Sequence, residues 1–184
     1  MTRRVYTFDR PDRFVAGTIG EPGGRTFFLQ ARQGGDLVSV VLEKTQVAVL
    51  AQQLDALLDI LTDRGVEGVP AEADPAQADD APLGEPLVEA FRVGAMSLGW
   101  DGENDRVVIE AAALPEDGES SAEDVEDETD GPDLVRIQID GPTARAFVER
   151  ATRVVAAGRP LCPRCGEPLD PQGHICARPT AYLN

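Results

Sequence analysis

The chain has 184 residues, of which 42% are hydrophobic, and a formal net charge of −16. This length allows one domain or two small ones. No apolar run approaches the roughly 20 residues of a membrane helix, which excludes a helical membrane protein. So acidic a surface repels nucleic-acid phosphates, which disfavours general nucleic-acid binding. The N-terminal sequence MTRRVYTFDRPDR lacks the apolar centre of a signal peptide, so we expect a cytoplasmic protein.

The first part of the chain predicts three strands and a helix. Phe14–Ile19, Thr26–Ala31 and Leu37–Leu42 are rich in β-branched and aromatic residues and are separated by glycine-containing turns. A helix is predicted to follow from Gln46, with Thr45 as its cap. The apolar residues of this helix recur at steps of three and four and form one stripe: Val47, Leu50, Leu54, Leu57, Leu58 and Leu61. A short leading strand, Val5–Phe8, is expected to join this first sheet.

The second part repeats this order. Strands are predicted at Phe91–Leu98, Arg106–Ala112 and Leu134–Ile139, and Pro142 and Gly158 suit the start and the end of the helix that follows. One such unit would be marginal alone, whereas two can share a core. We therefore expect an α+β fold of two tandem β-β-β-α repeats with pseudo-twofold symmetry. The expected sheet is mainly antiparallel, with two helices and a small C-terminal zinc-binding tail.

Composition divides the chain into repeats, linker and tail. Residues 1–64 form the first repeat and residues 87–158 the second. Residues 65–86 are rich in proline, alanine and acidic residues without an apolar period, which predicts a flexible linker. Residues 115–133 contain ten acidic residues and no basic one, which predicts a loop inserted into the second repeat. This loop is either merely solvated or an electrostatic docking site for a basic partner. Residues 159–184 form the tail.

The tail holds all three cysteines and the only histidine of the chain. Their spacing is Cys-x2-Cys-x8-His-x-Cys, formed by Cys162, Cys165, His174 and Cys176. Three thiolates and one imidazole are a standard ligand set for structural zinc. A tail this short buries too little apolar surface to fold alone, and metal binding can supply the missing free energy. We therefore predict one structural zinc ion bound by these four residues.

Two other interpretations of the cysteines fit the sequence less well. A Cys-Pro-x-Cys pair in a redox protein needs its first thiol at a helix N-terminus. Here Gly166, Pro168 and Pro171 follow and disfavour a helix. A catalytic zinc needs an open position for water, whereas four ligands close the shell. With His174 on the metal, no histidine remains as a general base, so we predict no catalytic residue and no cofactor other than zinc.

Two segments resemble a known family. FDRPDRFVAGTIGEPGGRTFFLQAR, which starts at Phe8, and PLCPRCGEPLDPQGHIC, which ends at Cys176, are similar to the actinobacterial domain-of-unknown-function family numbered 3090. The resemblance covers nearly the whole chain and is closest at these two ends. It implies an intracellular bacterial protein. It implies no activity, and no catalytic residue can be transferred from it.

Three functions are compatible with these observations. The absence of catalytic motifs favours a non-enzymatic binding or adaptor module, with another protein as its partner. The alternative is an enzyme or a small-ligand-binding protein whose site lies in the cleft between the repeats and uses arginine and acidic side chains. A third function is specific nucleic-acid binding through the tail, where Arg159, Arg164 and Arg178 lie. A deep polar pocket between the repeats would favour the second, and a basic patch around the tail the third.

Overall fold

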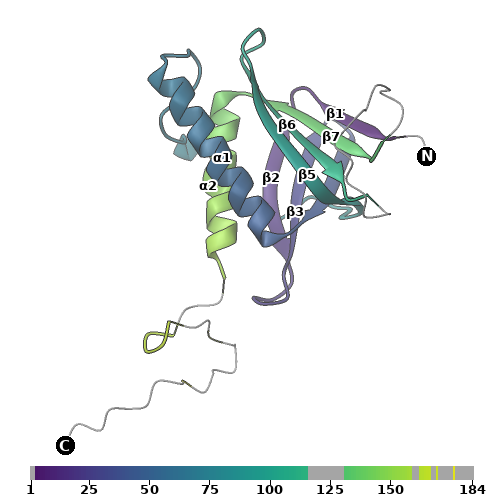
Figure 1. Cartoon of the computed structure of the whole chain (residues 1–184), viewed down its shortest axis with the longest axis vertical. Helices are drawn as coiled ribbons and strands as arrows, with labels where there is room; N and C mark the ends of the chain where they lie inside the picture. The colour runs from purple at the N-terminus through teal and green to yellow at the C-terminus, as the bar shows by residue number, and fades with distance from the viewer. Residues whose placement is uncertain (1–2, 116–130, 159–161, 167–168, 170–175, 177–184) are drawn as a thin grey trace, which may run out of the picture.

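The computed structural model describes residues 3–115, 131–158, 162–166, 169 and 176. Seven strands form one mixed sheet, and two helices lie side by side against one side of it (Figure 1). The strands are β1 (Val5–Phe8), β2 (Arg13–Ile19), β3 (Thr26–Gln33), β4 (Asp36–Leu42), β5 (Glu89–Asp101), β6 (Arg106–Ala113) and β7 (Leu134–Ile139). The helices are α1 (Lys44–Asp63), α2 (Gly141–Ala156) and the short 3-10 helix η1 (Pro75–Gln77). No helix in the described part is long and apolar enough to cross a membrane.

The strand order of the sheet is β1-β7-β6-β5-β4-β3-β2. Strands β2, β3 and β4 pair antiparallel, as do β5, β6 and β7. The two parallel pairs are β4 with β5 and β1 with β7. The predicted α+β class with a mainly antiparallel sheet and two helices is therefore confirmed. Strands β2, β3 and β4 with helix α1 form the first half of the body, and strands β5, β6 and β7 with helix α2 form the second half. The pseudo-twofold symmetry of these two halves stays a prediction.

The leading strand does not join the first half of the sheet, so that prediction was wrong. β1 pairs with β7 at the opposite edge, with Val5 beside Leu134. Two further bonds fix this position: the Arg4 N–H donates to Asp133 Oδ1 and the Leu134 N–H donates to Arg4 O, both at 2.8 Å. Contacts between residues far apart in sequence determine which strand an edge strand pairs with, and local sequence patterns do not predict these contacts.

Helix α1 presents its predicted apolar stripe to the core but begins at a different residue. Its N-cap is Glu43 and not Thr45, because the side chain of Gln46 reaches back and its Oε1 accepts from the Glu43 N–H at 2.8 Å. The stripe packs as predicted, except that one member is only partly buried. The buried members are Val47, Leu50, Leu54, Leu58 and Leu61, and the partly buried one is Leu57.

Helix α2 joins the two halves of the chain into one core. Asp140 caps it, since its Oδ1 accepts from the Thr143 N–H at 2.9 Å, and Pro142 lies in its first turn as predicted. Phe147 of α2 stacks on Phe14 of β2 with ring centroids 4.5 Å apart. All seven strands and both helices contribute to this one cluster of buried side chains.

Residues 65–86, predicted as a flexible linker, make specific contacts with the rest of the chain that were not predicted. Val69 is buried. The Gly84 N–H donates to Gln30 Oε1 at 2.7 Å. Asp79 accepts from Arg13 Nε at 2.6 Å and from an Arg150 terminal nitrogen at 2.8 Å. Backbone and charged contacts therefore attach this segment to β2, β3 and α2. The domain boundaries stay predictions, and the predicted acidic loop lies almost entirely outside the described residues.

Candidate metal centre

The first two cysteines lie in a tight turn that follows α2 in the chain (Figure 1). The Gly166 N–H donates to Cys162 O at 2.9 Å, which closes the turn Cys-Pro-Arg-Cys-Gly. Gly166 has a φ of 76°, in the left-handed region that glycine enters without a steric penalty. Its position directly after Cys165 lets the chain reverse there. The local sequence therefore brings both thiols of the turn to one side.

The third cysteine joins these two. The sulfur atoms of Cys162, Cys165 and Cys176 all lie within 4.8 Å of one another, and none of the three forms a disulfide. Sulfurs that share a tetrahedral zinc ion at about 2.3 Å lie about 3.8 Å apart. The three thiols are thus near enough to hold one ion after movements of about 1 Å. Cys162 is buried, while Cys165 and Cys176 are half-buried.

The surroundings of Cys162 favour its thiolate. The backbone N–H groups of Cys165 and Arg164 donate toward its sulfur and lower the pKa of the Cys162 thiol, against the opposing effect of burial. The neighbouring thiols of Cys165 and Cys176 add to this lowering. Since the thiolate is the form that binds metal, the turn prepares this sulfur as a ligand. Three thiolates fit a soft or borderline cation such as zinc.

The structure brings three of the four predicted ligands together. His174 lies outside the described residues, so its role as the fourth ligand stays a prediction. The helix required by the redox interpretation is not found at Cys162, because residues 162–166 form a turn. Across the described ranges, no second group of three or more histidine, cysteine or acidic side chains has the proximity of a metal site.

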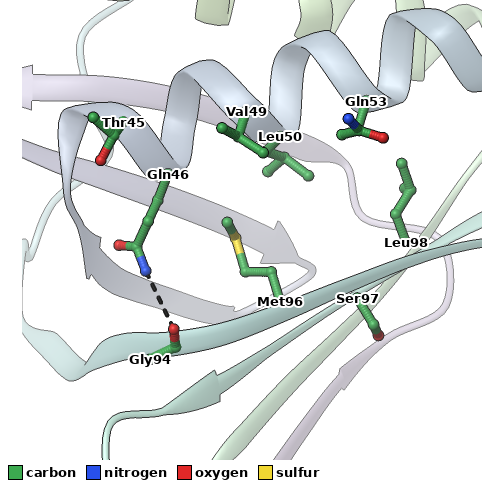
Figure 2. A pocket seen from close by; sticks show the side chains of 9 residues that line it. All are labelled: Thr45, Gln46, Val49, Leu50, Gln53, Gly94, Met96, Ser97 and Leu98. Atoms are coloured by element: carbon green, nitrogen blue, oxygen red, sulfur yellow. Dashed lines mark hydrogen bonds between the residues drawn. The ribbon is translucent and has the colours of Figure 1, made fainter.

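A cavity of about 300 Å³ lies where α1 of the first half faces β5 of the second (Figure 2). It is lined by Thr45, Gln46, Val49, Leu50, Gln53, Gly94, Met96, Ser97 and Leu98. None of these residues carries a charge. The cleft between the halves therefore exists at this place, but without the arginine and acidic side chains that were expected to form its chemistry.

A charged cavity of about 200 Å³ lies between β2, α2 and the segment that joins the halves. Two guanidinium groups, Arg13 and Arg150, share the carboxylate of Asp79 there. The hydrogen bond from Arg13 lowers the pKa of Asp79. Arg150 is buried and also donates to the backbone oxygens of Ala16, Asp79 and Ala81. These donors are used for internal contacts, which attach the joining segment to β2 and α2.

Sequence reasoning missed this cluster and a second buried arginine. Arg145 of α2 is buried, donates to Pro70 O, and bridges Asp55 and Asp59 of α1 at 2.6 and 2.7 Å. The only signal in the sequence is the spacing of the carboxylates, since two aspartates four residues apart lie on one face of a helix. Their partner comes from a helix far along the chain, which no local pattern predicts.

Comparison with known proteins identifies the family alone. No curated protein and no solved structure matches the chain. The family model described as "Protein of unknown function (DUF3090)" matches residues 6–176, and Cys176 is the last residue of that match. The match includes both halves of the body and the cysteine cluster. The chain therefore belongs to this family of unknown function.

Proposed function

We propose that the chain is a non-enzymatic binding module whose tail is held by one structural zinc ion. The observation that carries this proposal is the convergence of three thiols around a turn that favours thiolate. The ligands would be Cys162, Cys165, Cys176 and His174. When bound, zinc supplies a cross-link that lets a short segment hold one conformation. The tail then presents a rigid surface to a protein partner.

The charged groups of the body support binding over catalysis. The buried guanidinium groups of Arg145 and Arg150 donate to carboxylate and backbone oxygens of the same chain. The only histidine is assigned to the metal, and four ligands fill a tetrahedral shell, which leaves no place for a reacting water. We also place the protein in the cytoplasm, where thiols are kept reduced and available to metal.

The second candidate function is a small-ligand-binding protein or an enzyme with its site between the halves. One observation favours it, the cavity between α1 and β5. The uncharged lining suits an apolar ligand and offers no acid, base or anion-binding group. The lining therefore favours the small-ligand-binding form of this candidate, which predicts that the chain binds small apolar molecules.

The test compares partner capture by three preparations of the full chain. Wild-type protein, Cys165→Ser and wild-type protein stripped of metal would each be immobilised and exposed to native lysate. The proposal expects partners that are retained by the wild type, lost in the other two, and regained when zinc is restored to the stripped protein. Capture that is equal for all three would contradict a role for the metal-bound tail.

A further inference from the structure

The long strand β5 has an open edge. β4 pairs only with its beginning, through Ser39 beside Glu89 and Val41 beside Arg92, and ends at Leu42. β5 continues to Asp101 and pairs with β6 along that length. Among the described residues, no strand lies on the other side of β5 beyond Arg92. Alternate backbone N–H and C=O groups of residues 95–101 therefore point away from β6, and no described strand forms hydrogen bonds with them.

A side chain closes the start of this edge. Gln46 Nε2 donates to Val93 O at 3.1 Å and to Gly94 O at 3.4 Å, as Figure 2 shows for Gly94. The β5–β6 register also shifts between Val93 and Ala95. After Ala95 the strand is regular again, and in the described part no side chain takes the role of Gln46. An open, regular edge is the usual template for an added strand.

An apolar groove runs beside the open edge. Met96 and Leu98 of β5 point toward α1, whereas Ser97 points away and donates to Glu110 Oε2 at 3.1 Å (Figure 2). From the helix, Val49 faces the same groove and is 53% exposed, although it is a large apolar side chain. Successive side chains of an added strand would alternate between this groove and solvent. In strand addition, such a groove supplies side-chain specificity and the strand edge supplies backbone hydrogen bonds.

The charge at the far end of the edge indicates which strand would fit. Asp101 ends β5, and the turn that follows it carries Glu103 and Asp105. The nearest basic residue in sequence is Arg106, which already faces Asp140 at 3.9 Å. A peptide with basic side chains is attracted to this end. A second copy of the chain, with its own net charge of −16, is repelled.

We propose that residues 95–101 of β5 and the facing side of α1 form a docking site for an extended peptide of another protein. The peptide adds as a strand to β5, places apolar side chains in the groove and carries basic residues at the alternate positions. This inference rests on the proposed binding role and names the chemistry of the partner.

The test uses synthetic heptapeptides in which valine, leucine, isoleucine or phenylalanine alternates with lysine or arginine. Their binding to the full, zinc-loaded chain would be measured by fluorescence polarisation. We expect some of them to bind with dissociation constants below about 100 μM, as is common for short peptide motifs. N-methylation of alternate peptide amides, which removes donors but keeps side chains, should weaken binding at least about tenfold.

A matched pair of variants locates the site. Val49→Lys should weaken binding at least about tenfold, because it puts a charge into the groove. Ile60→Lys should leave binding unchanged, since Ile60 is 49% exposed on the same helix but is not part of the groove lining. Replacing the peptide lysines with glutamate should weaken binding as well. Thermal unfolding of both variants checks that the fold is intact.

Three results would overturn strand addition: no peptide that binds the wild type, binding that N-methylation leaves unchanged, or a wild-type dimer that Val49→Lys dissociates. The second result would show that the peptide binds through its side chains without strand pairing, and the third would assign the groove to a second copy of the chain. Partner capture that depends on Cys165 but not on Val49 would leave the zinc-held module standing and remove this inference. Peptide binding by the metal-free chain would support the docking site independently of zinc. The zinc proposal is tested separately, by partner capture with Cys165→Ser and with metal-stripped protein.

Discussion

Two regions of the chain have few apolar residues, and they are held in different ways. Between the halves, Asp79 accepts hydrogen bonds from two arginines of the body, and Gly84 is bonded to Gln30 of β3. In the tail, the thiols of Cys162, Cys165 and Cys176 face one another. The first region takes its partners from the folded body. The second brings its own thiols together, and under our proposal a bound ion joins them.

Because the two regions are held in different ways, we expect the stability of the body and that of the tail to be independent. Removing the Asp79 carboxylate leaves the buried guanidinium group of Arg150 without its ionic partner, so the stability of the whole fold should fall. Removing a thiol of the tail should affect the tail alone, because the core cluster contains no tail residue within the described part. Each change below tests one side of this separation.

The largest effect is expected from cutting the body in two. Residues 1–64 expressed alone should be unfolded, because Leu54 and Leu58 of α1 and Phe14 of β2 would lose the half of the core that α2 and the second set of strands provide. Amide dispersion in an NMR spectrum measures this directly. A dispersed spectrum with native-like shifts would show two independent domains and contradict a shared core.

A single carboxylate should have the next largest effect. Asp79→Ala leaves the buried Arg150 without its ionic partner and should lower the free energy of unfolding by about 2–3 kcal/mol. The control is Asp80→Ala, whose side chain is 74% exposed and pairs with the exposed Arg153. That change should cost less than about 1 kcal/mol. Equal losses in urea unfolding would mean that the segment is not fixed through Asp79.

Acid should weaken the same contact. The Arg13 hydrogen bond lowers the pKa of Asp79, and the Arg136 hydrogen bond lowers the pKa of Glu110. A carboxyl group with a lowered folded-state pKa stabilises the fold above its unfolded value of about 4 and loses this contribution as the pH falls through the folded value. Stability should thus be level from pH 7 to about 5 and decline below about 4. Asp79→Asn should reduce the decline; an unchanged profile would contradict the assignment.

The smallest effect is expected from the acidic segment. Replacing residues 116–130 with a three-residue glycine-serine linker should change the thermal midpoint by less than about 2 °C, since the sequence there has almost no apolar residue to bury. The β6–β7 connection retains its closing bond, in which the Ala113 N–H donates to Asp133 O at 2.7 Å. A large loss of stability would show that this segment packs on the body.

Local patterns predicted most elements of this fold. The helix α1 was predicted from the spacing of its apolar residues, and the strands were predicted from their β-branched and aromatic composition. Both patterns lie within short stretches of sequence. The partner of β1, the contacts of Asp79 and the burial of Arg145 depend on groups far apart in the chain. The spacing of residues within one element does not predict such long-range contacts. The extension of β5 past the end of β4, which creates the open edge, is likewise a property of the assembled sheet.

The clustering of the three cysteines could be predicted because they are close in sequence. Cys162 and Cys165 share one turn, and Cys176 follows within the same short tail. The hydrogen bonds to the Cys162 sulfur could not be predicted, because they depend on the conformation of the turn.

Zinc K-edge X-ray absorption on the full chain, purified without chelator, tests the central claim most directly. The account predicts one zinc per chain with three sulfurs at about 2.3 Å and one nitrogen at about 2.0–2.1 Å. The sulfurs belong to Cys162, Cys165 and Cys176, and the nitrogen to His174. Metal-free protein with intact reduced thiols would contradict a structural zinc. A water oxygen in place of the nitrogen would contradict the closed shell and, with it, the non-catalytic role.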